Sequence, residues 1–216
     1  MIEEYSRDAI VVRDGKKMTA PALAELEELS FADLPEQKFE AFITDGLSTL
    51  PQTLGKVKNM EEKTIRWKGH AEQIALLIDM GFFSERPINL ARGTRVSPRA
   101  LLSTLMERKL AMHQGDKDMT LLRVEIKGRK KKGDRSTRTH QYEMVDKYDT
   151  STQTTSMART TAYPCSVVAQ MILEGKITET GFLPPELAIH DERFDEYLSR
   201  LERKGLNMKE REFLSD

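Results

Sequence analysis

The chain has 216 residues, 38% of them hydrophobic and 32% charged, and its 34 Lys and Arg against 35 Asp and Glu leave a formal net charge of −1. This length suits one large or two small domains with a packed core. The even charge excludes a generally polybasic nucleic-acid binder and a self-repelling acidic chain. One cysteine excludes an internal disulfide, and with four scattered histidines it makes no zinc-binding spacing, so we expect no metal.

Neither a membrane segment nor a phosphate-binding motif is visible in the sequence. No run approaches the roughly 18 consecutive apolar residues of a membrane span, and the start Met-Ile-Glu-Glu-Tyr is acidic where a signal peptide is basic. We therefore expect a cytoplasmic protein without membrane contact. The chain also contains no Gly-x-Gly-x-x-Gly and no Gly-x-x-x-x-Gly-Lys-Ser/Thr, so it has no recognisable phosphate cradle of its own.

The first third of the chain is predicted to consist mainly of strands. Asp14-Gly15 lies between apolar-rich runs and predicts a β-hairpin over residues 10–18, because both central positions of a type I′ turn favour a positive φ. The next predicted elements are a strand over 39–43, which ends in the turn Thr44-Asp45-Gly46, a short helix over 47–54 and a strand over 61–67.

Two amphipathic helices are predicted next. In residues 71–82 the apolar side chains share one helical face, and Gly81 marks the end; these side chains are Ile74, Leu77, Ile78 and Phe82. The second helix begins at Ser97-Pro98, a good cap and first-turn pair, and ends before Gly115.

The last hundred residues predict a long hairpin followed by helices. Residues 121–127 and 138–147 alternate in polarity as antiparallel strands, with 128–135 as their tip. A helical pattern then carries Ala158, Ala162, Cys165, Ala169 and Ile172 and stops at Gly175; Pro164 either begins or bends this helix. An amphipathic helix carrying Phe194, Tyr197, Leu198 and Leu201 closes the chain.

Together these elements predict an α+β fold with a mixed or antiparallel sheet and helices on one face. We expect a single domain over residues 1–216, in which 191–216 form a C-terminal helical extension.

Two features have a structural explanation that we favour over a functional one. The basic tip, Arg129 to Lys132 with Arg135, keeps a long hairpin soluble. A nucleic-acid site would need neighbouring aromatic residues or a second basic patch, so we expect no nucleic-acid partner. Cys165 has no histidine close in sequence, which favours a small buried hydrophobic side chain over a nucleophile.

Polar residues at two strand ends are the candidate ligand contacts. Thr44-Asp45-Gly46 and the segment from Thr64 to His70 each lead from a strand into a helix, where α+β domains present ligands. Turn chemistry is the alternative explanation for both segments. His70 either contacts a ligand or orients the turn, and periodicity does not decide between these roles.

Five segments in order resemble one known family. They are FEAFITDGLSTL (39–50), EKTIRWKGH (62–70), LLIDMGFF (76–83), TSMARTTAYP (155–164) and GFLPPE (181–186). These segments resemble the C-terminal half of the saccharopine dehydrogenase family, and within it the L-lysine 6-dehydrogenase branch is the most similar. The resemblance runs from residue 1 to about residue 190.

The resemblance implies a fold like the C-terminal domain of glyceraldehyde-3-phosphate dehydrogenase. It also implies the substrate-binding and dimerisation part of a two-part enzyme that acts on an amino acid's CH–NH bond as a homodimer. In this family an N-terminal Rossmann domain binds NAD or NADP. We expect that domain to be absent from this chain, cut off or encoded separately, so that the chain alone binds no cofactor and is almost inactive. The alternative is a non-catalytic dimerisation or ligand-binding module that works with a partner chain.

Residue by residue, the resemblance carries over substrate contacts but no catalytic acid or base. It makes Thr64 a substrate contact, and it places Thr44 where the saccharopine branch has an arginine. Because saccharopine's extra carboxylates call for a charge-assisted partner, this difference favours a smaller amino acid such as lysine. Arg66 then remains as a carboxylate anchor, Asp45 as a partner for an amino group and His70 as a polar contact. Arg66 or Asp45 could instead form a structural ion pair.

Overall fold

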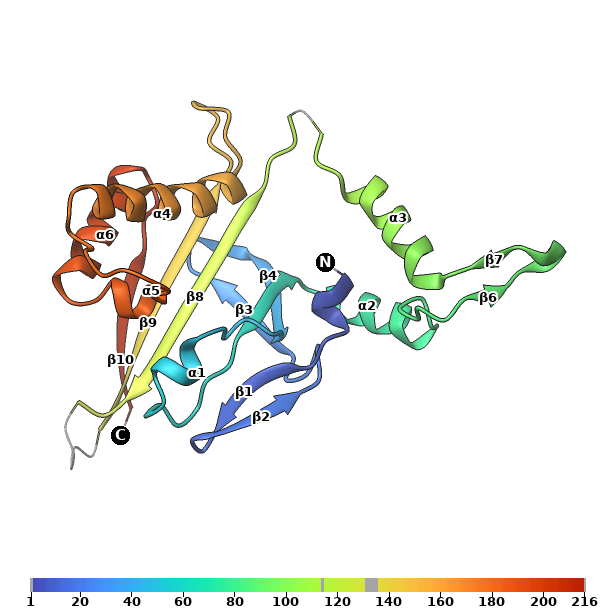
Figure 1. The fold of residues 1–216 in the computed structure, drawn as a ribbon, viewed down its shortest axis with the longest axis horizontal. Helices are drawn as coiled ribbons and strands as arrows, with labels where there is room; N and C mark the ends of the chain where they lie inside the picture. Colours follow the sequence, from blue (N-terminus) through green and yellow to red (C-terminus); the bar gives the residue numbers. More distant parts are fainter. Residues whose placement is uncertain (1, 114, 131–135, 216) are drawn as a thin grey trace. The chain divides into compact units, whose positions relative to one another are not determined.

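A computed structural model describes residues 2–113, 115–130 and 136–215 (Figure 1). The chain divides into two compact units, Met1–Gln114 and Gly115–Asp216. Every pair of neighbouring strands in the described residues is antiparallel, and helices accompany the sheets in both units, which confirms the α+β class. No helix in the described part of the chain is long and apolar enough to cross a membrane.

The first unit consists of short helices and of strands that form three separate sheets among the described residues. Its elements are η1 (Ile2–Tyr5), β1 (Ala9–Arg13), β2 (Lys16–Ala20), β3 (Glu27–Phe31), β4 (Leu34–Ile43), α1 (Leu50–Thr53), β5 (Lys63–Trp67), α2 (His70–Asp79), β6 (Ile88–Asn89), η2 (Ala91–Gly93), β7 (Arg95–Val96) and α3 (Pro98–Leu110). Strands β1 and β2 pair, β3, β4 and β5 form a sheet in that order, and β6 pairs with β7.

The β1–β2 hairpin confirms the prediction made from Asp14-Gly15. Asp14 has φ 49° and Gly15 has φ 77°, so both central residues adopt the positive φ that a type I′ turn requires. Figure 1 shows the two strands as a narrow ribbon in dark blue.

The sheet β3-β4-β5 supports the core of the first unit. In its register Phe42 lies opposite Thr64, and Glu40 lies opposite Arg66, so these four side chains share one face. Against this face the buried side chains of Tyr5, Phe42, Ala71 and Ile74 form a core cluster that joins η1, β4 and α2. One face of the sheet therefore carries both apolar core residues and polar groups.

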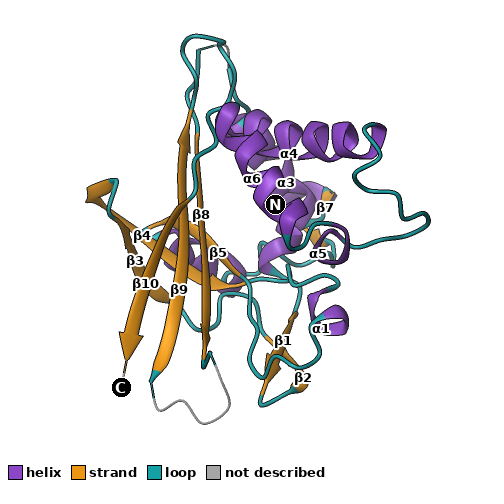
Figure 2. Cartoon of the chain, turned by 90° about the vertical axis from the view of Figure 1, so that its left-hand side faces the viewer, coloured by secondary structure: helices purple, strands orange, loops and turns teal. Residues whose placement is uncertain are grey.

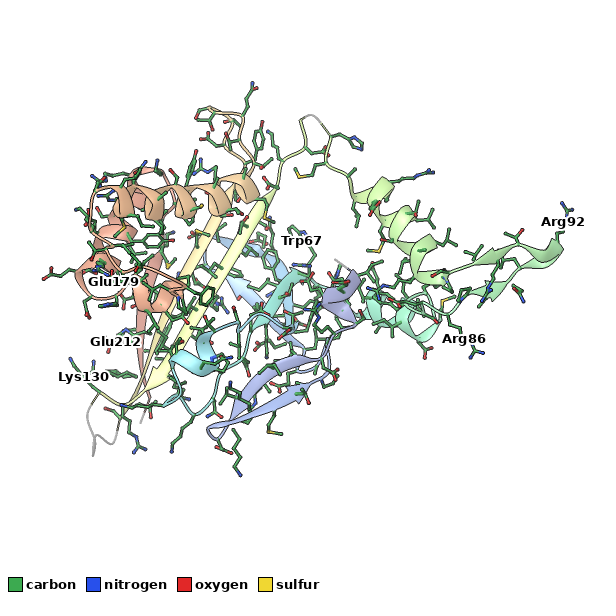
Figure 3. The ribbon with its side chains drawn as sticks, viewed as in Figure 1. Trp67, Arg86, Arg92, Lys130, Glu179 and Glu212 are labelled. Carbon is green, nitrogen blue, oxygen red and sulfur yellow. The ribbon has the colours of Figure 1, made fainter. Side chains whose placement is uncertain are left out.

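Helix α3 has the predicted start but buries little of its apolar surface. The Ser97 hydroxyl accepts a hydrogen bond from the Ala100 backbone amide, and Pro98 is the first helical residue. Leu102 is buried, whereas Leu101 and Leu105 are exposed. The chain before α3 forms the short β6–β7 hairpin, which the sequence analysis missed; Figure 3 shows Arg92 at its tip.

The predicted helix over 71–82 is shorter than expected. Helix α2 ends at Asp79, and Gly81, with φ 82°, stops it in the left-handed conformation. Phe82 therefore lies beyond the helix, while Ile74 is buried as predicted. Strand β3 was also missed, because within Glu27–Phe31 only Leu29 and Phe31 are apolar, too few to show a clear alternation.

The second unit is a three-stranded sheet with helices packed against it. Its elements are β8 (Met119–Gly128), β9 (Thr137–Lys147), α4 (Ser156–Leu173), α5 (Pro185–Ala188), α6 (Glu192–Arg203) and β10 (Lys209–Ser215), and the sheet order is β10-β9-β8. Helices α4 and α6 lie together beside the long strands (Figure 2). Val167, Met171, Ile177, Leu201 and Leu206 form the buried core between them.

The prediction that Cys165 is buried is wrong. Cys165 is exposed, as are the other four residues of the apolar pattern that was used to predict this helix. The buried stripe of α4 is instead Ser156, Arg159, Val167 and Met171. The helix runs through Pro164 without interruption, since it begins at Ser156, eight residues earlier.

Two further predictions concern the ends of elements in this unit. Residues 191–216 are helical only as far as Arg203, because Lys209–Ser215 form strand β10, which pairs with β9. At the basic tip, Arg129 and Lys130 are exposed, and Figure 3 shows Lys130 at the end of the hairpin. Lys131, Lys132 and Arg135 lie outside the described residues.

Candidate functional site

Four of the five predicted site residues lie together in the first unit, on its sheet or directly beside it. Thr64 and Arg66 alternate along β5 on one face, Thr44 directly follows β4, and His70 begins α2. Thr44 is 3% exposed, whereas Thr64, Arg66 and His70 are half-buried. The strand register therefore brings together residues that are up to 26 positions apart in sequence.

A row of oxygen atoms links these strands. The Thr44 hydroxyl lies 2.5 Å from Oε2 of Glu62 and 2.7 Å from the Thr64 hydroxyl, and the Thr64 hydroxyl lies 2.9 Å from Oε1 of Glu4. All three distances lie within the range of O–H···O hydrogen bonds. Two carboxyl groups are thus connected through two threonine hydroxyls.

Arg66 and His70 also contact residues of η1, namely Glu4 and Tyr5. Nη2 of Arg66 donates to Oε1 of Glu4 at 3.0 Å, and Nε donates to the Tyr5 hydroxyl at 3.3 Å. Nε2 of His70 lies 3.0 Å from that hydroxyl. The site thus has two carboxyls, one guanidinium, two aliphatic hydroxyls, a phenol and an imidazole, which can bind ammonium, carboxylate and hydroxyl groups.

Glu40 positions His70 by capping helix α2. This buried carboxylate, on β4, accepts hydrogen bonds from the backbone amides of Gly69 at 2.8 Å and Ala71 at 2.5 Å. A negative charge at this end also complements the helix dipole. The sheet therefore fixes the first turn of α2, and with it the imidazole of His70.

Replacing Glu40 by alanine is expected to destabilise the first unit by about 1 to 3 kcal/mol, because the buried amide of Ala71 and the half-buried amide of Gly69 lose their acceptor. Urea unfolding followed by the fluorescence of Trp67, the single tryptophan, would measure this change. Glu28→Ala is the control, since Glu28 lies opposite Glu40 on β3 but is exposed and forms an ion pair with Lys68. Equal midpoints for the two variants would contradict the capping role.

Burial shifts the pKa of two groups in the site. Desolvation raises the pKa of Glu62 above its ordinary value, against the lowering effect of the Thr44 hydroxyl, and the nearby charge of Glu4 raises it further. The backbone of Gly46 closes over this carboxyl, because an added Cβ there would lie 2.7 Å from Cδ of Glu62. Desolvation, followed by the charge of Arg66, lowers the pKa of His70. Neutral forms of both groups are favoured.

Asp45, the fifth predicted residue, forms no hydrogen bond with this row in the described structure. Its Oδ1 accepts from the Ile10 amide at 3.3 Å, and its Oδ2 lies 4.0 Å from Nη1 of Arg7. Arg66 pairs with Glu4 instead. Asp45 is exposed beside the site, where it adds negative charge near Glu62.

Sequence reasoning missed Glu4, Tyr5 and Glu62. Glu62 was within reach, because Glu62, Thr64 and Arg66 follow the period of two that a strand gives to one face. Glu4 and Tyr5 gave no such signal, since they lie some 60 positions from their partners and only the tertiary fold brings them there.

The described residues do not fit a dinucleotide cofactor. The amides at the start of α2 are taken by Glu40, those at the start of α4 are taken by Asp118, and the strand pairs of both units are antiparallel, without a βαβ crossover. The same residues contain no group of three His, Cys, Asp or Glu side chains placed to hold a metal ion.

The second unit contains a hollow lined by other residues. It measures about 460 Å³ and is lined by Gln170, Glu174, Arg200, Arg203 and Lys204. Arg200 is held by Glu174 and Glu196, so its charge serves the packing of α6 against α4. The hollow has no side chain suggestive of catalysis and is not part of the candidate site.

Comparisons with known proteins agree with one another. A family model described as the saccharopine dehydrogenase C-terminal domain matches residues 1–206. Among curated proteins, the saccharopine dehydrogenase (NADP(+), L-glutamate-forming) of Schizosaccharomyces pombe is 33% identical over 106 residues, which are 49% of this chain and 22% of that protein. Its counterpart from Pyricularia oryzae is 27% identical over 133 residues, 61% of this chain and 28% of that protein. The chain thus corresponds to only about a quarter of either relative.

A solved structure shows the same fold. The apo histidine-tagged saccharopine dehydrogenase (L-Glu forming) from Saccharomyces cerevisiae superposes with a TM-score of 0.73 at 19% sequence identity. The match covers 98% of this chain and 60% of that one. At this identity the likeness concerns the fold alone.

Proposed function

Because this chain belongs to the saccharopine dehydrogenase C-terminal domain family, we propose that it is the substrate-binding part of an NAD(P)-dependent oxidoreductase that acts on the CH–NH bond of an amino acid. The observation that carries the proposal is the convergence of Thr44, Thr64, Arg66 and His70 in one polar site. The names of the two curated relatives favour NADP(+) as the cofactor. A part outside these 216 residues would bind the nucleotide, because the described residues do not fit it.

The side chains of the site favour lysine over saccharopine as the substrate. Arg66 is the cation of the site, and it already pairs with Glu4. Thr44 is uncharged, and its hydroxyl contacts another hydroxyl and a carboxyl. A ligand with several carboxylates would meet more negative than positive charge here, since Glu4 and Asp45 outnumber Arg66, whereas the ammonium groups of lysine would be attracted by Glu4 and Asp45.

The proposed roles of the residues follow from their chemistry. Arg66 would bind the substrate carboxylate by charge-assisted hydrogen bonds, and Thr64 would donate a hydroxyl to the same ligand. Asp45, on the exposed rim, would attract an amino group, while His70 would contact the ligand as a neutral imidazole because burial lowers its pKa. These groups bind and orient the substrate, and the hydride would leave for a nicotinamide held elsewhere.

Arg66→Gln is expected to weaken L-lysine binding about 10-fold to 100-fold, the equivalent of about 1.5 to 3 kcal/mol for a hydrogen bond to a charged group. Isothermal titration of the purified 216-residue chain with L-lysine and, separately, with saccharopine would measure this effect. Arg7→Gln is the matched control, since Arg7 is exposed and lies 4.0 Å from Asp45. NADP should not bind the chain, and turnover by the chain alone should be negligible.

The alternative outcomes separate the parts of the proposal. Tighter binding of saccharopine than of lysine would overturn the choice of substrate. If neither amino acid binds, the chain acts as a dimerisation or ligand-binding module of a partner chain, or the site requires the nucleotide-binding part. A homodimer remains a prediction, supported by the apolar side chains of Leu122, Val124 and Ile126, which are exposed along one face of β8.

A further inference from the structure

The row of oxygen atoms in the site has more contacts than hydroxyl protons. Three oxygen–oxygen contacts join Glu62 to Thr44, Thr44 to Thr64 and Thr64 to Glu4, at 2.5, 2.7 and 2.9 Å respectively. Each threonine hydroxyl carries one proton, and an ionised carboxyl carries none. Two protons cannot fill three hydrogen bonds, so with both carboxyls ionised one contact would place two oxygen lone pairs against each other.

The extra proton belongs on Glu62 rather than on Glu4. Glu4 accepts a hydrogen bond from the guanidinium of Arg66 at the same oxygen that contacts Thr64, and this cation favours the ionised carboxylate. Glu62 forms no ion pair among the described residues, and the backbone of Gly46 closes over it. The charges that act on its pKa are Glu4, Arg66 and Asp45, two negative and one positive.

We propose that Glu62, Thr44, Thr64 and Glu4 form a directed chain of hydrogen bonds that stores one exchangeable proton, with Glu62 as a neutral carboxylic acid. The Glu62 carboxyl donates to Thr44, Thr44 donates to Thr64, and Thr64 donates to the ionised Glu4. Every contact then has one proton, and the burial of Glu62 has no uncompensated charge. The raised pKa of Glu62 agrees with this arrangement.

The chain predicts opposite effects for two neighbouring substitutions. In Thr64→Val the Thr44 hydroxyl keeps Glu62 as its one described hydrogen-bond partner, so it donates to Glu62, stabilises the carboxylate and lowers the pKa of Glu62. In Thr44→Val both forms of Glu62 lose this hydroxyl, and the ionised form loses more because hydrogen bonds to a charged group are stronger, so the pKa of Glu62 rises. Burial alone predicts a rise or no change for both variants, because each replaces a hydroxyl by a methyl group.

Carboxyl carbon NMR of the 216-residue chain labelled at glutamate would measure these shifts, and Glu62→Gln would identify the signal. We expect Glu62 to titrate above its ordinary pKa in the wild type, lower in Thr64→Val and higher in Thr44→Val. Thr64→Ser keeps the hydroxyl and should titrate as the wild type does. An ordinary pKa in the wild type, or a rise in Thr64→Val, would overturn the proposal.

The pH dependence of the free energy of unfolding gives a second test, which does not require the valine variants to fold. The native state keeps the Glu62 proton at pH values where the unfolded chain has released it, so the free energy of unfolding falls as pH rises from about 4.5 to the raised native pKa. Glu62→Gln keeps a donor to Thr44 and should remove this part of the pH dependence. An unchanged pH profile in this variant would contradict a neutral Glu62.

The use of the stored proton rests on the proposed function. An ammonium group bound beside the two carboxyls favours their ionised forms, so lysine binding should release a proton. Calorimetry in two buffers of different ionisation enthalpy would show this release in the wild type and its loss in Glu62→Gln. If the valine variants shift as expected but lysine does not bind, the proposed function fails and the proton-storing chain stands.

Discussion

Replacing Arg159 by methionine is expected to destabilise the second unit by about 3 to 5 kcal/mol, the largest effect of any single charge removal considered for this chain. Arg159 is a buried cation on α4, with a side chain 9% exposed. It lies 3.2 Å from Asp146 and 2.8 Å from Asp149, and it donates to the carbonyl of Gly205 at 3.3 Å. One guanidinium thus connects the end of β9, the following turn and the segment after α6.

The loss of stability arises because methionine fills a similar volume but cannot pair with the two carboxylates. Asp146 is as buried as Arg159, and without the cation its negative charge would remain desolvated and unpaired.

Urea unfolding followed by circular dichroism at 222 nm would test this prediction, because most of the helical residues of the second unit lie in α4 and α6. Arg138→Met is the matched control, since Arg138 forms an ion pair with Glu212 on the exposed surface of the same sheet. Such pairs contribute little. Equal midpoints for the two variants would show that the buried cluster is not needed for stability.

Arg159 also shows why the sequence predicted the wrong face of α4. The apolar residues from Ala158 to Ile172 on which the prediction was based repeat at helical spacing. A second stripe, on another face of the same helix, contains Arg159, Val167 and Met171. Because charged side chains usually face the solvent, the presence of Arg159 argues against burial of the second stripe. The structure buries it because two aspartates, contributed by the preceding strand and turn, neutralise the arginine. Local periodicity cannot contain that information.

Elements whose causes are local were predicted well. The hairpin at Asp14-Gly15 depends on two adjacent residues, and the cap of α3 depends on Ser97 and Pro98. Strand β10 was missed because it is defined by pairing with β9, more than 60 positions away along the chain. The same holds for the site. Thr64 and Arg66 were predicted from a sequence motif and a family resemblance, whereas Glu4 and Tyr5 are brought to the site only by the tertiary structure.

Phe42→Ala is expected to destabilise the first unit by about 3 to 5 kcal/mol and to alter the site at the same time. The Phe42 ring is fully buried, with its centroid 6.1 Å from that of Tyr5 and 6.4 Å from that of His70, to which it lies parallel. Removing it leaves a cavity under both rings. Trp67 fluorescence during urea unfolding would report the loss in stability.

The effect on His70 distinguishes lost support from general destabilisation. Burial is the main cause of the lowered pKa of His70, so water entering the Phe42 cavity should raise that pKa towards its ordinary value of about 6.5. Between the lowered pKa and 6.5 the unfolded chain binds more protons than the native state, so stability increases with pH there, and Phe42→Ala should weaken this dependence. Proton NMR of the imidazoles would follow the titration, with His70→Gln identifying the signal.

Phe39→Ala provides the matched control for both readouts. Phe39 is equally buried on β4 but lies on the opposite face, where its ring contacts Trp67 at a centroid distance of 4.8 Å and Phe31 at 5.7 Å. It should cost similar stability yet leave the pKa of His70 unchanged, because no site residue loses a neighbour. If both variants shifted His70 alike under conditions where each is folded, the titration would report loosening of the whole sheet, and Phe42 would not be a specific support of the site.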